Sequence, residues 1–291
     1  MKFFKVLSVC SFVLLVTACG QRSMPDSGAA DPEFRVESKI YSLLRAPQLD
    51  EKGAGHFIDR DENTIFIKDQ SGTQTTTFNY TYGTTYHWSD IHLPQEIKQC
   101  QISACYPPVQ TSDFKNFKWD VNKKKGIDLL LASPVKASTE SSSPINLSFR
   151  HALHKLSVVL IPQGNKVSSD ILSKAVITCK NVKSIAVIDL LNGKAITSNG
   201  PTIELTKNGA TTNFLIPAQE VGDMEISINV EGREAHYQLS KLKIKDQQLK
   251  NLESGKAFSL QVKVSKESFT IVGQNISGWE KQGEADGTIT L

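Results

Sequence analysis

Short apolar runs recur along the chain from Phe34 onward, and Gly, Pro, Asn and Asp residues separate them. In residues 258–264 apolar and polar positions alternate, which places four apolar side chains on one face of an extended chain. Such runs, often rich in β-branched residues, predict strands. The other strands predicted in this way lie at residues 64–67, 153–161, 184–188, 214–216 and 225–230.

Helical periodicity is nearly absent, and short helices are expected only at residues 167–174 and 247–253. Many short strands at this spacing predict an all-β fold of the sandwich type. The Ser-rich stretch at residues 136–144 could be a linker between two domains or a loop inside the first of them.

The N-terminal segment has the three parts of a lipoprotein export signal. Lys2 and Lys5 precede an apolar run at residues 6–16, which is too short for the roughly 20 residues that a membrane-spanning helix needs. Small residues then lead into Cys19 in the sequence LVTAC. We expect residues 1–18 to be a signal peptide and Cys19 to carry the lipid anchor. The alternative is an ordinary secretory signal with a chance cysteine.

The remaining length suits two domains. Removal of residues 1–18 leaves 273 of the 291 residues, and an all-β chain of that length is more often two domains than one. Residues 19–35 are mostly small or polar and are expected to form a flexible tether. We place an N-terminal β-sandwich domain at residues 36–163 and a C-terminal β-sandwich domain at residues 164–291.

The charge balance argues against a nucleic-acid partner. Without residues 1–18 the chain carries 31 Lys and Arg residues against 30 Asp and Glu residues. Such a chain lacks the basic footprint of a protein that binds nucleic acid. The run of three lysines at residues 123–125 is better explained as a solvated turn than as a binding patch.

Three cysteines need an explanation once Cys10 is removed with the signal and Cys19 is acylated. Cys100 and Cys105 are close in sequence, and export exposes them to oxidising chemistry, so a local disulfide between them is one possibility. Cys179 lies in an apolar, strand-like run and is expected to be a buried free thiol.

No pattern in the chain points to catalysis. His151 and His154 are three residues apart, and in a strand such residues point to opposite faces, so the two side chains cannot easily share a metal. No nucleophile elbow, phosphate-binding glycine loop or zinc-protease motif is present. We therefore expect no enzyme activity, no catalytic residues, no metal and no cofactor.

A series of motifs resembles one known family. The segment FRHALHKL at residues 149–156 follows the pattern F-x-H-x-L-x-x-L, and DLLLA at residues 128–132 precedes it. Both resemble elements of the fimbrillin (Mfa-like) family of type V pilus subunits. Further matches, in the family's order, are a strand with Arg-Ala at residues 40–46, Trp88 with ACYP at 104–107, FLIPAQ at 214–219, and GKAF at 255–258 with ISGW at 276–279.

The resemblance, which spans about residues 36–285, implies two tandem transthyretin-like, Ig-like Greek-key β-sandwich domains without catalysis. It also implies export as a lipoprotein to the cell outer membrane and assembly into surface fimbriae. In such pili an arginine-specific protease removes the first strand, and a strand from another fimbrial subunit fills the groove by β-strand addition. Arg45 and Arg35 are the candidate cutting sites. We prefer Arg45 because a good strand precedes it, and the alternative is that neither is cut.

The last residues of the sequence bear on which position in a fimbrium the resemblance implies. Residues 287–291 are strand-like but reach only about 17 Å. This length favours a tip or accessory subunit, which receives a donor strand without giving one, and which could contact host or bacterial surface ligands.

A different reading is a surface glycan-binding lipoprotein of the outer membrane, in which aromatic residues such as Trp88, Trp119 and Tyr86 stack on sugar rings. A β-sandwich hydrolase is the least favoured of the three interpretations.

Overall fold

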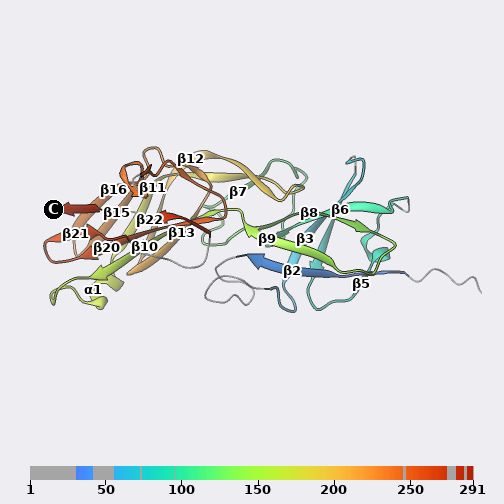
Figure 1. Cartoon of the computed structure of the whole chain (residues 1–291), viewed down its shortest axis with the longest axis horizontal. Helices are drawn as coiled ribbons and strands as arrows, with labels where there is room; N and C mark the ends of the chain where they lie inside the picture. The colour runs from blue at the N-terminus through green and yellow to red at the C-terminus, as the bar shows by residue number, and fades with distance from the viewer. Residues whose placement is uncertain are drawn as a thin grey trace, which may run out of the picture. The chain divides into compact units, whose positions relative to one another are not determined.

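The computed structural model describes residues 31–41, 56–72, 74–94, 96–244, 247–273, 280–284 and 287–290. These residues are mostly strand, so the fold is all β, as the pattern of apolar positions predicts (Figure 1). Within the described ranges the helices are short: α1 (Ser169–Ser173) and the 3-10 turns η1 (Trp88–Ile91) and η2 (Leu239–Lys241).

Six strands from the first half of the chain form one sheet. Their spatial order is β2 (Val36–Tyr41), β9 (Ile145–His151), β8 (Leu130–Ser138), β6 (Gln99–Tyr106), β3 (Glu62–Asp69) and β4 (Thr75–Thr81). Neighbouring strands are antiparallel except for β2 and β9, which are parallel. A short ribbon pairs β1 (Glu33–Phe34) with β5 (Tyr86–His87).

Both faces of this sheet are covered. Strand β3 shows this, because five consecutive residues, 63–67, are buried, whereas the outer strand β9 buries only alternate residues. One face carries a core that includes Ile65 and Ile102. On the other face Phe66 joins a second core with Trp119 and Ile188, which come from strands of a different sheet.

The Ser-rich stretch is a loop within this sheet. Strand β8 ends at Ser138 and β9 begins at Ile145, and the two strands are antiparallel neighbours. The stretch therefore connects adjacent strands, and the alternative that it links two domains is wrong.

Two further sheets are built mainly from the second half of the chain. One contains β13 (Thr211–Ile216), β10 (His154–Pro162), β20 (Lys256–Val264), β21 (Ser268–Ile271) and β23 (Gly287–Thr290), with β22 (Glu280–Glu284) also paired to β20. The other contains β12 (Lys194–Asn208), β11 (Val176–Asp189), β15 (Glu225–Val230) and β16 (Arg233–Gln238), with β7 (Phe117–Asp120) also paired to β11.

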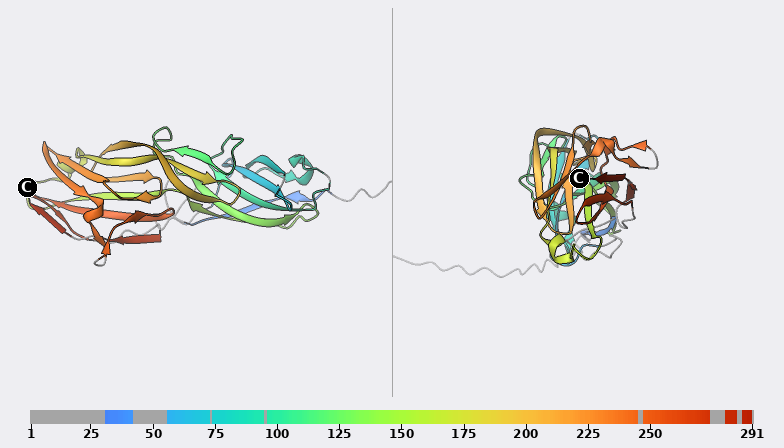
Figure 2. Two further views of the ribbon diagram at one scale, coloured as in Figure 1. Left: turned by 90° about the horizontal axis from the view of Figure 1, so that it is seen from above. Right: turned by 90° about the vertical axis from the view of Figure 1, so that its left-hand side faces the viewer.

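These two sheets enclose a common apolar core, which makes this part of the chain a sandwich (Figure 2). Alternate residues of β15 are buried, and Ile226 and Ile228 face the core. From the opposite sheet Phe258 and Leu260 of β20 enter the same cluster. Burial of such side chains from both layers is the main favourable term in holding the sheets together.

The two helix predictions had different outcomes. Helix α1 lies inside the range expected, and the Ser168 hydroxyl caps it by accepting a hydrogen bond from the Ile171 N–H at 3.3 Å. Residues 247–253 are not helical. They form β18 (Gln247–Gln248), which pairs with β17 (Lys243–Ile244), and β19 (Asn251–Leu252), which pairs with β14 (Gln219–Glu220). Leu249 and Leu252 are nevertheless both buried.

The sheets change partners close to the middle of the chain. Strand β9 ends at His151 in the first sheet, whereas β10 begins at His154 and pairs with β13 and β20. Strand β7, from the first half of the chain, pairs with β11. The division into two tandem domains at residues 163 and 164 stays a prediction.

Candidate functional site

Strand β2 occupies an edge of the first sheet. It pairs with β9 through Val36 opposite Ile145, Ser38 opposite Leu147 and Ile40 opposite Phe149 (Figure 1). Within the described residues β9 is its single neighbour in the sheet. An edge strand has one row of backbone groups outside the ladder, so β2 is held by fewer hydrogen bonds than a central strand.

Alternate side chains around β2 enter the core. Phe34, Val36 and Ile40 are only 1, 5 and 2 % exposed, whereas the intervening charged residues point to solvent. The Phe34 ring packs edge-on against Trp88 with 4.8 Å between ring centroids. The pattern anchors the strand through one face and leaves the other face free.

Two tyrosines connect β2 to the far edge of the same sheet. The Val36 N–H donates to the Tyr80 phenol oxygen at 3.4 Å, and Tyr82 lines the same cavity as Ser38 of β2. Tyr80 lies on β4, the opposite edge strand, and Tyr82 follows directly. The sheet is therefore curved enough for both edges to contact one core. Burial raises the pKa of both phenols, which keeps them neutral hydrogen-bonding groups.

A cavity of about 570 Å³ borders this strand. Residues 36–39 of β2 and 146–148 of β9 line it, together with His56, Phe57 and Tyr82. The Phe57 ring stacks on Tyr82 with centroids 4.9 Å apart, so the phenol has support from outside β2.

The candidate processing sites fall on the two sides of β2. Arg35 lies between β1 and β2, its side chain pairs with Glu37 at 2.8 Å, and its carbonyl accepts a hydrogen bond from the Ile145 N–H at 2.8 Å. Arg45 follows β2 in the sequence, and both Arg45 and Cys19 lie outside the described residues.

The two motif segments that carry the family resemblance meet through their polar residues. Asp128 precedes β8 and His151 ends β9, and the Asp128 Oδ2 contacts the His151 Nδ1. Their side chains are 9 and 2 % exposed. The other Asp128 oxygen accepts a hydrogen bond from the Leu129 N–H at 2.8 Å. The sequence alone did not predict this pair. A signal was available, because each polar residue stands beside apolar positions of its motif segment.

His154 has a different role from His151. It is fully buried, and its Nδ1 lies 2.9 Å from the carbonyl oxygen of Glu253. Burial lowers the pKa of His154 to about 4, so the ring is neutral in the folded protein near pH 7. The Ser254 hydroxyl also donates to the Ala152 carbonyl at 2.8 Å. These contacts fix the connection between β9 and β10 against the turn before β20.

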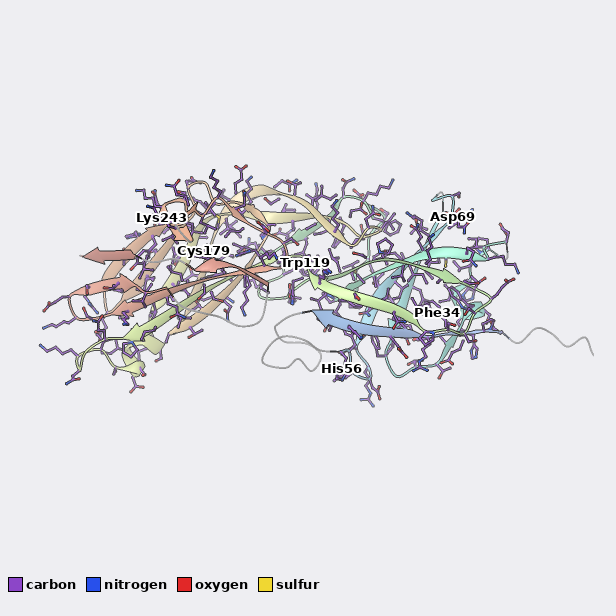
Figure 3. All side chains as sticks on the ribbon, in the orientation of Figure 1. Phe34, His56, Asp69, Trp119, Cys179 and Lys243 are labelled. Carbon is purple, nitrogen blue, oxygen red and sulfur yellow. The ribbon has the colours of Figure 1, made fainter. Side chains whose placement is uncertain are left out.

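The disulfide considered for Cys100 and Cys105 is wrong for this fold. Both thiols are free. They are five positions apart on β6, so they point to opposite faces, and each enters a different core. Cys179 is a buried free thiol, as predicted, and it lies in the sandwich core (Figure 3).

The aromatic residues weighed as sugar platforms are packed inside. Trp88 is 7 % exposed and Trp119 is 1 % exposed. Tyr86 is half-buried beside Phe78, with centroids 4.9 Å apart. A ring that is covered by its own core cannot stack on a ligand, so these residues do not support the glycan-binding interpretation.

The lysine run, possible metal sites and possible membrane-spanning helices are considered next. Residues 123–125 form an exposed turn, as expected from the three lysines. In the parts of the chain that the structure describes, no group of three or more His, Cys, Asp and Glu residues is placed to hold a metal ion. No helix within those same parts has the length and apolar character to cross a membrane.

Comparison with known proteins places the chain in a family. The model of a family described as fimbrillin-like matches residues 53–279. A curated relative, named as the fimbrium subunit Fim1C of Bacteroides uniformis, is 24 % identical over 152 residues, which cover 50 % of this chain and 50 % of the relative. The chain thus aligns with half the length of that relative.

Solved structures share the fold. A protein of Bacteroides uniformis described as a cell adhesion protein has a TM-score of 0.59 at 18 % identity, covering 90 % of this chain and 98 % of that one. A similarly described protein of Bacteroides ovatus has a TM-score of 0.58 at 14 % identity, covering 86 % of this chain and 98 % of that one. Since the family model matches well over half of the residues, this chain belongs to the fimbrillin-like family.

Proposed function

We propose that this protein is a non-enzymatic fimbrial subunit whose first strand, β2, is replaced by a strand from another subunit. The observation that carries the proposal is the place of β2 at the edge of its sheet, paired to β9 alone among the described strands. A strand in that place can leave without breaking the sheet. An extended segment can then bind by β-augmentation at the vacated position beside β9, the β2 seat.

Burial explains why β2 would stay until it is cut. Phe34, Val36 and Ile40 are almost fully buried, and burial of a large apolar side chain is worth roughly 1.5–3 kcal/mol. While the strand is covalently attached, its local concentration is high and an outside strand competes poorly. Cleavage after the strand removes that advantage.

The order of the two arginines favours Arg45 as the cutting site. Cleavage after Arg35 would leave β2 attached to the remainder of the chain, because the strand begins at Val36. Cleavage after Arg45 would separate both β1 and β2, which end at Phe34 and Tyr41. Only the second cut frees the seat beside β9.

The lipid anchor gives the cut a second consequence. In this proposal Cys19 is acylated during export and holds the precursor at the cell outer membrane. Because Cys19 precedes Arg45, cleavage after Arg45 would release the lipid, the tether and the first strand together. The anchor is then a delivery device for cut molecules and a permanent attachment for uncut ones.

Within a fimbrium we assign this chain to a tip or accessory position. Strands β22 and β23 pair with β20 and β21 of the chain's own sheet. Strands that complete the chain's own sandwich are not available to a neighbour, which favours receiving a strand over giving one. Such a position would expose the subunit to host or bacterial surface ligands.

Limited proteolysis tests the proposal. The folded protein is digested with an arginine-specific protease, and the new N-terminus is sequenced. We expect Ala46 as the new first residue, and native gels should then show association with other subunits of the same fimbrium. Arg45→Lys should abolish the cut, whereas the matched variant Arg35→Lys should leave it unchanged. Resistance at Arg45, or a new N-terminus at Val36, would contradict the strand-release model.

A further inference from the structure

The segment that would leave the β2 seat carries a buried aromatic ring at its start. Phe34 of β1 is 1 % exposed, whereas the buried residues that follow it, Val36 and Ile40, are aliphatic. The next residue after Phe34 is Arg35, whose carbonyl already accepts a hydrogen bond from the backbone of β9. Because one residue joins β1 to β2, a strand that fills the β2 seat also brings a side chain to the position of Phe34.

Three aromatic rings surround Phe34, and we call the space between them the ring pocket. The Phe34 ring centroid lies 4.8 Å from that of Trp88. Phe78 and Tyr80 complete the pocket, with centroids 5.9 and 6.0 Å from that of Phe34. All three pairs meet edge-on, an arrangement that the charge distribution of aromatic rings favours beyond apolar burial alone. An aliphatic side chain in the ring pocket would lose this added attraction.

The three rings are held by contacts that β1 and β2 do not supply. Phe78 and Tyr80 lie on β4 and Trp88 begins η1, so all three follow the proposed cut in the sequence. The Tyr86 ring packs against Phe78 at 4.9 Å and against Tyr80 at 5.3 Å. The Trp88 indole N–H donates to the Ser141 carbonyl at 3.2 Å. We therefore expect the ring pocket to persist when Phe34 has left.

We infer that the β2 seat selects an incoming strand by an aromatic residue that enters the ring pocket two residues before an apolar one. The occupant is an extended segment of another fimbrial subunit, running in the direction of β2. It carries an aromatic residue at the position of Phe34 and apolar residues at those of Val36 and Ile40. The inference rests on the proposed strand exchange and names the partner that this exchange would accept.

The ring also fixes the register of the incoming strand. Side chains on one face of a strand repeat every two residues, so a strand that slips by two residues still turns the same face to the seat. Such a slip moves the ring out of its pocket to the position of Val36, where the seat holds a smaller buried side chain. A strand with a ring at its first inward position therefore has one favoured register, which an all-aliphatic strand lacks.

Peptide binding to the cleaved protein tests the inference. After digestion and removal of the protease, labelled peptides covering residues 33–41 compete with the retained N-terminal fragment, and fluorescence anisotropy gives their affinities. The decisive comparison is between the native peptide and one that combines Phe34→Val with Val36→Phe, because the two have the same composition and length. The exchanged peptide should bind at least about tenfold more weakly, since its ring misses the pocket. Equal or tighter binding of the exchanged peptide would overturn the inference.

A variant of the pocket wall assigns the effect to the rings. Phe34→Leu in the peptide should weaken binding to the unaltered protein about tenfold, and binding to Trp88→Leu protein by a smaller factor. Ile40→Leu, at the other end of the peptide, should change the affinity for both proteins by the same factor. If Trp88→Leu does not fold, Phe78→Leu at the half-buried wall replaces it. A Phe34→Leu effect of the same size on both proteins would contradict the role of the ring pocket.

The outcomes also separate the two levels of the argument. If no peptide binds, the native one included, the strand exchange itself fails and the inference fails with it. If the native and exchanged peptides bind alike, the exchange stands and only the selectivity is wrong.

Trp88 also reports directly on the ring pocket. It is 7 % exposed with Phe34 in place, so removal of the N-terminal fragment should shift its fluorescence to longer wavelength. The native peptide should reverse this shift. Trp88→Phe protein should show no shift, because Trp119 is 1 % exposed in a different core and stays covered. An emission spectrum unchanged by removal of the fragment would contradict the opening of the pocket on which the inference depends.

Discussion

The carboxylate of Asp128 contacts the imidazole of His151, and the two side chains are almost completely withdrawn from solvent. They join the residue that precedes β8 to the last residue of β9. The pair gives a physical reason for the two motif segments to occur together: each supplies one half of a buried polar contact that an apolar neighbour could not satisfy.

Loss of one partner should therefore be costly. We expect Asp128→Ala to lower the free energy of unfolding by about 3 kcal/mol, because His151 is left in a buried site without its carboxylate. Asp128→Asn keeps a hydrogen-bonding side chain and should cost less. Urea denaturation measures both values. The control is His236→Gln, whose side chain is 45 % exposed and should change stability by less than about 0.5 kcal/mol. An Asp128→Ala protein of unchanged stability would exclude a structural role for the pair.

The buried ring of His154 predicts a dependence of stability on pH. Burial lowers the pKa of His154 from 6.5 to about 4, so the unfolded chain binds a proton on this group at a higher pH than the folded chain does. The contribution of His154 to the free energy of unfolding is complete above pH 6.5 and is lost as the pH falls from 6.5 toward 4. The loss should amount to about 3 kcal/mol at most.

A paired variant isolates this effect from other carboxylates and histidines. His154→Gln keeps a donor for the Glu253 carbonyl and does not titrate. Denaturant unfolding between pH 7 and pH 4 should show the wild-type protein losing more stability than the variant. Parallel pH profiles for the two proteins would contradict the assignment.

The three described cysteines should be unreactive in the folded protein. Burial raises the pKa of Cys100 to about 11 and of Cys105 and Cys179 to about 12, so each stays a thiol at pH 8. For a protein produced without residues 1–19, mass spectrometry after iodoacetamide treatment should find no adduct under native conditions. The same protein in guanidinium should take up one adduct on each thiol. A mass lower by two hydrogens without adducts at Cys100 and Cys105 would restore the disulfide.

Gly193 lies at a close backbone approach between two sheets. Its φ is +58°, and an added Cβ would lie 2.3 Å from the carbonyl oxygen of Ala132. The neighbouring Leu190 carbonyl also accepts a hydrogen bond from the Ser103 hydroxyl at 2.9 Å, so this turn is fixed against β6. We expect Gly193→Ala to destabilise the protein by more than about 3 kcal/mol, since the backbone cannot move aside cheaply.

Gly232→Ala is the matched control. Gly232 has a similar φ of +80°, but nothing lies within 4 Å of its added Cβ. This variant should show only the conformational cost of about 1–2 kcal/mol. Equal melting temperatures for the two variants would mean that the turn at Gly193 does not contact Ala132.

Local pattern was sufficient for much of this fold. The strand at 225–230 was predicted to the residue, because alternate buried and exposed positions follow the period of two that an extended chain imposes. Residues 247–253 misled the prediction because apolar residues three apart fit one face of a helix as well as a bent extended chain. Pairing with β14 and β17 decides the outcome there, and that pairing is a long-range contact.

The candidate site depends on long-range contacts to a greater degree. That Val36 and Ile40 share a face follows from the sequence. That the Tyr80 phenol reaches the Val36 N–H does not, because it requires the sheet to curve until its two edge strands face one core. The disulfide considered for Cys100 and Cys105 depends on whether both residues lie on one strand, since an odd separation within a strand places two side chains on opposite faces.

The parallel course of β2 beside β9 has a consequence for the geometry of assembly. Under the proposed exchange, the seat on one molecule and the strand on another are different surfaces, so their contact is heterologous and has a direction. Such a contact does not form a two-fold symmetric dimer in which the same surface of each molecule meets its copy. A subunit that offers the seat while its last described strands complete its own sandwich would be the point at which a growing filament stops.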